Sequence, residues 1–201
     1  MPKILAWDWP VRIGHWLMVA GFILAWLTAE SESLRLVHVV AGATVLAAAA
    51  FRILWGVVGT RTARFADFVR GPTAVRDYLL GLLRLQPAHY TGHNPAGGWA
   101  IVLLLGFGLL TGASGWAIYN DLGGHWLEEL HEGFASAMLV VVIVHLVGVL
   151  SGSVLHGENL VQAMLSGYKD GRQEEAIPSA RPLAAAALLM WIVAAVWWLA
   201  R

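Results

Sequence analysis

Five long apolar stretches constrain the fold of this chain more than any other feature. A bilayer core roughly 30 Å thick requires about 20 apolar residues in a helix. The stretches with that character are residues 13–29, 36–58, 99–119, 133–155 and 183–199. Charged residues make up only 13% of the chain, about half the share in soluble domains. The pattern predicts an all-α integral membrane protein with five transmembrane helices.

The charged residues between the stretches predict an orientation. Residues 59–98 carry five arginines, whereas the link before residue 133 holds only acidic charges. Cytoplasmic loops are enriched in Lys and Arg, so we expect the N-terminus in the cytoplasm and the C-terminus in the periplasm. The expected location is the bacterial inner membrane. A formal net charge of zero argues against nucleic acid as a partner.

Within the long loop, residues 73–85 place apolar side chains at helical spacing. They predict a short amphipathic helix packed on the bundle at the cytoplasmic surface.

The chain contains eight histidines and no cysteine. The absence of cysteine excludes disulfides, iron–sulfur clusters, and haem attached through a Cys-x-x-Cys-His motif. A redox metal would therefore need histidine or methionine ligands. Metal-binding side chains are rare inside membrane helices and usually functional there. Four histidines lie in or beside the apolar stretches: His15, His38, His131 and His145.

The spacing of these histidines predicts two pairs. His131 and His145 are fourteen residues apart, which places them on one helix face about 21 Å apart. His38 shares the depth of His131 just inside the outer surface, and His15 shares the depth of His145. We therefore expect two haems with bis-histidine iron, held by His38/His131 and His15/His145. Such haems have no open position, which suits electron transfer.

Two arginines are candidate partners for haem propionates. Arg52 lies fourteen residues after His38, on the same face but at the depth of the inner haem. Arginine at that depth is costly unless it is paired, and a guanidinium binds carboxylates as a fork. Arg12, one turn before His15, is the second candidate. Five glycines are candidates for close approach of a macrocycle or of a neighbouring helix: Gly14, Gly21, Gly42, Gly148 and Gly152.

The other histidines are expected to be solvated. His89, His93 and His125 lie in predicted loops, and His156 lies near the cytoplasmic surface. Two places are candidates for a quinone site: the inner side near His156 and Asn159, and the outer acidic link.

Several motifs in order resemble the bacterial cytochrome b561 and nickel–iron hydrogenase cytochrome b subunit family, whose wider relatives include formate dehydrogenase cytochrome b. The resemblance covers roughly residues 7–170. Its motifs are residues 9–16 (WPVRIGHW), 38–42 (HVVAG), 52–56 (RILWG), 63–65 (ARF), 92–95 (GHNP), 130–132 (LHE), His145 and 158–164 (ENLVQAM).

The resemblance implies a four-helix membrane bundle with two b haems. In that family the ligands are one histidine each from helices one and two and two from helix four, which match His15, His38, His131 and His145. Members exchange electrons between quinones and a hydrogenase, a dehydrogenase subunit or a cytochrome c. The fifth helix departs from the pattern. We therefore expect a di-haem domain at residues 1–170, followed by a linker and an additional C-terminal transmembrane helix at residues 171–201.

Our leading hypothesis is a cytochrome b in a respiratory chain, whether alone or as part of a quinone-linked oxidoreductase. We expect lipid, quinone and a redox protein as its partners. A homodimer is a further candidate assembly. One alternative is a haem-free membrane transporter or scaffold whose histidines bind metal or relay protons. The lack of Asp and Glu within the apolar stretches speaks against that alternative. A third hypothesis is a transmembrane reductase that acts on a small soluble donor.

Overall fold

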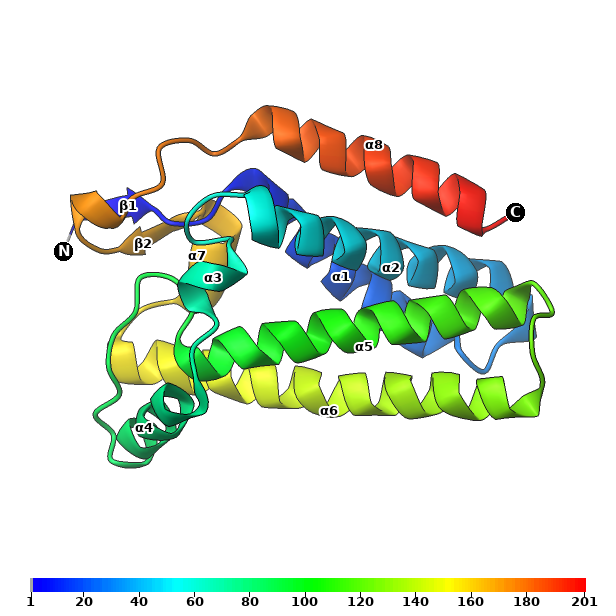
Figure 1. The fold of residues 1–201 in the computed structure, drawn as a ribbon, viewed down its shortest axis with the longest axis horizontal. Coiled ribbons are helices and arrows are strands. Elements are labelled where there is room, and N and C mark those ends of the chain that lie inside the picture. The colour runs from blue at the N-terminus through cyan, green and yellow to red at the C-terminus, as the bar shows by residue number, and fades with distance from the viewer. Residues whose placement is uncertain (1) are drawn as a thin grey trace.

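The computed structural model describes residues 2–201 and contains five helices long and apolar enough to cross a membrane (Figure 1). These are α1 (Trp9–Thr28), α2 (Arg35–Val58, preceded by a short 3-10 turn at Glu32–Leu34), α5 (Pro95–Tyr119), α6 (His125–His156) and α8 (Pro182–Leu199). The predicted all-α membrane architecture is confirmed.

Local sequence signals start two of these helices. Asp8 caps α1, because its side chain accepts a hydrogen bond from the Val11 amide, and Pro10 occupies the first turn. Asn94 caps α5 in the same way, accepting from the Gly97 amide at 2.7 Å, with Pro95 next. Proline suits these positions because its missing N–H would be unpaired there anyway.

The start of α6 was predicted wrongly. The helix begins at His125, eight residues before the apolar stretch at residue 133. His131, which the predicted stretch left just outside, therefore lies in the second turn of the helix. The acidic residues of these turns favour a helix N-terminus, because its dipole attracts negative charge. The helix thus continues beyond the apolar residues that the prediction was based on.

The long helices form an open bundle. Helix α1 packs along α2, α2 along α5, and α5 along α6. Over residues 2–201, the backbones of α1 and α6 make no comparable contact. Helix α8 lies outside this arrangement, along α2 and α1 (Figure 1). The four histidines of interest form two pairs, each with one ring from α6 and one from α1 or α2.

Small elements close the end of the bundle at which α1 begins, and together they are called the cap of the bundle (Figure 1). Strand β1 (Lys3–Leu5) pairs antiparallel with β2 (Tyr168–Asp170). Beside them lie α3 (Phe65–Phe68), α4 (Pro72–Leu83), α7 (Leu160–Ser166) and a 3-10 turn at Gln173–Glu175. Helix α4 is the amphipathic helix predicted at residues 73–85. The opposite end holds the short α1–α2 and α5–α6 connections and the C-terminus.

Candidate functional site

The structure places the rings of His38 on α2 and His131 on α6 opposite each other, inclined at 64°. Their ring centroids are 6.1 Å apart. His38 Nδ1 lies 2.8 Å from the Ala25 carbonyl oxygen, and His131 Nδ1 lies 3.0 Å from that of Thr111. A carbonyl only accepts hydrogen bonds, so we assign the hydrogen of each ring to Nδ1. Nε2 of each ring is then free to bind a metal, and the Nδ1 bond fixes the ring orientation.

His15 on α1 and His145 on α6 form the second pair. Their ring centroids are 6.5 Å apart. Trp16 lies edge-on to His15, with the ring centroids 5.0 Å apart. His15 Nδ1 is buried and makes no hydrogen bond. The two pairs thus lie at two depths of α6. In each pair the α6 histidine lies opposite a histidine of α1 or α2.

The geometry of both pairs fits an iron placed between them. Two imidazoles that share one metal, each bonded at about 2 Å through a nitrogen roughly 1 Å from its ring centroid, have centroids about 6 Å apart. Elsewhere in residues 2–201, His, Asp and Glu side chains gather in no group of three that could hold a bare ion. Two ligands per site suit a metal that brings its own equatorial ligands, as haem does.

Some of the candidate glycines leave open space. A Cβ added at Gly42 or at Gly148 would meet no atom within 4 Å, whereas one at Gly21 would press on Val45 and the Ala41 carbonyl. Gly21 therefore serves close packing of α1 on α2. Gly42 and Gly148 lie on the same helices as His38 and His145, and no neighbouring atom crowds their Cβ positions.

Arg52 is a buried cation on α2. Only 6% of its surface is exposed, and its guanidinium lies 5.3 Å from the Phe65 ring centroid and 5.9 Å from that of Phe68. Neither Nη1 nor Nη2 has a hydrogen-bond partner in the structure. Two buried donors without an acceptor are costly, so the site fits an anionic group such as a haem propionate.

Arg12 behaves differently. Its Nη2 donates to the Leu165 carbonyl on α7, and only its buried Nε lacks a partner. The structure therefore ties Arg12 to the end of the bundle, where it holds α7 against α1. A propionate role for Arg12 is less well supported than one for Arg52.

One of the loop histidines, His93, is not solvated as the sequence predicted. His93 lies between aromatic rings, with its centroid 4.5 Å from that of Trp7 and 4.7 Å from that of Phe68. The His89 side chain is 40% exposed, as predicted, and its Nε2 lies 3.6 Å from a carboxylate oxygen of the buried Glu158. His93 directly precedes Asn94, the residue that caps α5. A residue beside a helix cap is held rigidly, and this position in the sequence is the signal for the packing of His93.

His125 and His156 lie at the two ends of α6. The His125 side chain is 80% exposed and lies beside Glu128 and Glu129. It is solvated as predicted, although it opens the helix and does not lie in a loop. The His156 ring meets that of His89, with the centroids 5.2 Å apart.

Comparison with known proteins finds one matching family. The family model described as prokaryotic cytochrome b561 matches residues 6–167. A probable Ni/Fe-hydrogenase B-type cytochrome subunit of Rhodobacter capsulatus is 24% identical, with 86% of this chain and 84% of the relative covered. The proteins of the same description from Bradyrhizobium diazoefficiens and Cupriavidus necator are 24% and 25% identical, covering 85% and 80% of this chain and 87% and 84% of their own. No solved structure matches significantly.

Proposed function

Because the chain belongs to the prokaryotic cytochrome b561 family, we propose that it carries electrons across the membrane through two b-type haems. The observation that carries the proposal is that two pairs of imidazoles lie opposite each other at two depths of α6. Their centroid separations are 6.1 and 6.5 Å. His38 and His131 would hold the outer haem, and His15 and His145 the inner haem. Bound in this way, haem supplies reversible one-electron transfer at iron without an open position for oxygen.

The chain's own residues have three tasks in this proposal. The carbonyls of Ala25 and Thr111 hold the outer imidazoles in the tautomer that presents Nε2. Arg52 offers two unpartnered donors to the propionates of the inner haem. The apolar helices exclude water, so the charge of Arg52 is weakly screened and acts strongly on a nearby iron.

We propose a hydrogenase as the redox partner, because the relatives are described as Ni/Fe-hydrogenase cytochrome subunits. Quinone is the proposed second partner. The proposed location is the bacterial inner membrane, with the N-terminal end in the cytoplasm. The haem-binding domain would span residues 1–170, and residues 171–201 would add a linker and one helix.

The ligand assignment is tested by alanine variants of the four histidines. His15→Ala and His145→Ala should each remove the inner haem and leave the outer one, and His38→Ala and His131→Ala should do the reverse. His125→Ala is the control, because that side chain is exposed. A His145→Ala protein that keeps two haems per chain contradicts the assignment.

The quinone link is tested separately, by mixing the oxidised protein with a short-chain quinol or with ascorbate. Rapid haem reduction by the quinol alone supports the proposal. Reduction by ascorbate alone supports a reductase that uses a small soluble donor. Co-purification with a hydrogenase from a host that expresses both tests the partner.

A further inference from the structure

His93 is held rigidly at the cytoplasmic end of the proposed inner site. It directly precedes Asn94, the residue that caps α5. Its ring packs against Trp7 and Phe68. Phe68 in turn packs against the start of α5, where a Cβ at Gly98 would meet the Phe68 carbonyl oxygen at 2.9 Å. The His93 ring is therefore placed by packing on several sides and is not free to reorient.

This packing leaves a nitrogen of the ring without a hydrogen bond. His93 Nε2 is buried and has no hydrogen-bond partner, which is also true of Nη1 and Nη2 of Arg52. Both side chains contact Phe68: the His93 ring centroid lies 4.7 Å and the Arg52 guanidinium 5.9 Å from that ring's centroid. Three buried nitrogen atoms thus lack a hydrogen-bond partner in one small region.

The carboxylate of Asp8 does not supply that partner. Asp8 interacts electrostatically with Arg52, but its carboxylate already accepts from the Val11 amide, Trp55 Nε1 and Thr60 Oγ1. Burial lowers the pKa of His93 well below its usual range, and the charges of Arg52 and Lys169 lower it further. Lys169 is paired with Glu158 at 3.3 Å, so the guanidinium of Arg52 is the cation near His93 that has free donors for an anion.

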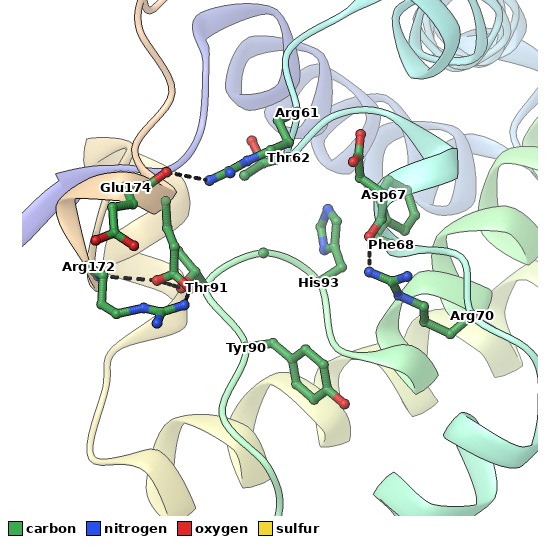
Figure 2. A pocket seen from close by; sticks show the side chains of 12 residues that line it. Arg61, Thr62, Asp67, Phe68, Arg70, Tyr90, Thr91, His93, Arg172 and Glu174 are labelled. Atoms are coloured by element: carbon green, nitrogen blue, oxygen red, sulfur yellow. Dashed lines mark hydrogen bonds and ion pairs between the residues drawn. The ribbon is translucent and has the colours of Figure 1, made fainter.

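A cavity of about 370 Å³ connects His93 with the polar surface of the cap. Figure 2 shows the His93 ring projecting into it, between Thr62 on one side and Phe68 on the other. Arg61 and Arg70 at its edge donate only to the backbone carbonyls of Glu174 and Asp67. A carboxylate beside His93 would thus have a buried side and a side open to water.

We propose that His93 and Arg52 together bind the propionate carboxylates of the inner haem, Arg52 as a fork and His93 through its Nε2–H. The inference rests on the proposed function, because it requires the inner haem between His15 and His145. It adds a binding residue that the histidine pairs do not include. A small anion from the cytoplasm has the same carboxylate or phosphate chemistry, so the test separates the two sources.

The test is a redox titration of the purified holoprotein with His93→Leu, His93→Gln and the control His125→Ala. Removing a donor from a propionate leaves more negative charge near the iron and favours ferric haem. We expect His93→Leu to lower the inner midpoint potential and leave the outer one unchanged. His93→Gln keeps an N–H and should restore the wild-type potential.

Several outcomes would overturn this inference. Unchanged potentials in His93→Leu, with both haems retained, contradict it. Loss of the inner haem in both His93 variants shows that the ring is needed for packing and not as a donor. A potential in wild type that shifts with added acetate or phosphate, and no such shift in His93→Leu, assigns the site to a free anion.

The failure of the proposed function would look different. A wild-type chain that binds no inner haem refutes the assignment of His15 and His145 before any His93 variant is measured. Loss of the inner haem in His93→Leu, with its retention at the wild-type potential in His93→Gln, supports the donor role.

Discussion

His38 and His131 each hold Nδ1 against a backbone carbonyl, whereas Nδ1 of His15 has no partner. The hydrogen of a metal-bound imidazole normally finds such a partner, and the bond orients the ring. The outer pair is therefore the better preorganised of the two. The position of His131 also depends on a residue without a side chain, Gly115 on α5.

We predict that Gly115→Ala disturbs the outer haem selectively. A Cβ at Gly115 would lie 2.8 Å from Cε1 and 3.2 Å from Nδ1 of His131, so the ring must move and its hydrogen bonds must break. Haem content should fall by up to one per chain. The matched control is Gly106→Ala on the same helix, where a Cβ meets no atom within 4 Å. Equal haem loss in both variants would contradict a specific role for Gly115.

A second prediction at this scale concerns Glu175 at the cap. Hydrogen bonds from Thr91, then from the amide and side chain of Arg172, lower the pKa of Glu175 to about 2. Because the folded pKa lies below the unfolded value, the carboxylate stabilises the fold above about pH 4.5, and this stabilisation is lost as the pH falls towards 2. For so accessible a group the effect is at most about 1 kcal/mol.

Thermal unfolding of wild type and Glu175→Gln in detergent checks this. The wild type should melt higher at pH 6, and the difference should disappear between pH 4.5 and 2. A difference that stays constant over that range would show that Glu175 acts through packing.

At the scale of whole elements, hydropathy located all five long helices, because a bilayer-spanning helix must be apolar over its full length. Periodicity also predicted α4. The first turns of α6 were missed because they extend beyond the apolar residues. The pairing of β1 with β2 joins residues 3–5 to 168–170, and no local pattern reports a contact so distant in sequence.

Helical arithmetic on residue numbers paired the same histidines that the structure brings together, since depth and face follow from 3.6 residues per turn. Their role as ligands stays a prediction. The burial of His93 could not be derived in that way. It depends on Trp7 and Phe68, which come from two other segments of the cap.

Helix α8 should be dispensable for haem binding. Its buried side chains Leu188 and Ile192 pack on α1 and α2, and Trp191 Nε1 donates to the Ala47 carbonyl at 2.9 Å. Lipid can replace the apolar contacts, because helices gain little hydrophobic energy from one another in a membrane.

Removal of residues 182–201 tests this. The truncation leaves intact the Ile177–Leu5 and Trp9–Ala180 backbone hydrogen bonds that hold the linker on the cap. Unchanged haem content and a somewhat lower melting temperature are expected. Loss of both haems would show that α8 belongs to the haem-binding domain.

At the scale of the whole molecule, charge is divided between the two ends. The arginine-rich residues 61–84 and the segment 169–181 lie at the end with the N-terminus, and the acidic α5–α6 link lies at the other (Figure 1). By the positive-inside rule, this division of charge supports the proposed orientation with the cap in the cytoplasm.

Single-cysteine labelling tests this orientation, because the chain has no native cysteine. A membrane-impermeant maleimide added to intact spheroplasts should label Glu129→Cys and spare Arg76→Cys, both of which replace exposed side chains. Labelling of both after permeabilisation is the control for reactivity. The reverse pattern in spheroplasts would invert the proposed topology.

The proposal that one chain carries two haems between paired histidines is tested most directly by counting haem in the purified wild-type protein. A pyridine haemochrome assay against protein concentration, with oxidised and dithionite-reduced spectra, gives that number. We predict two b haems per chain, both low-spin. One haem per chain would contradict one of the two pairs, and a folded protein without haem would contradict electron transfer through the histidines altogether.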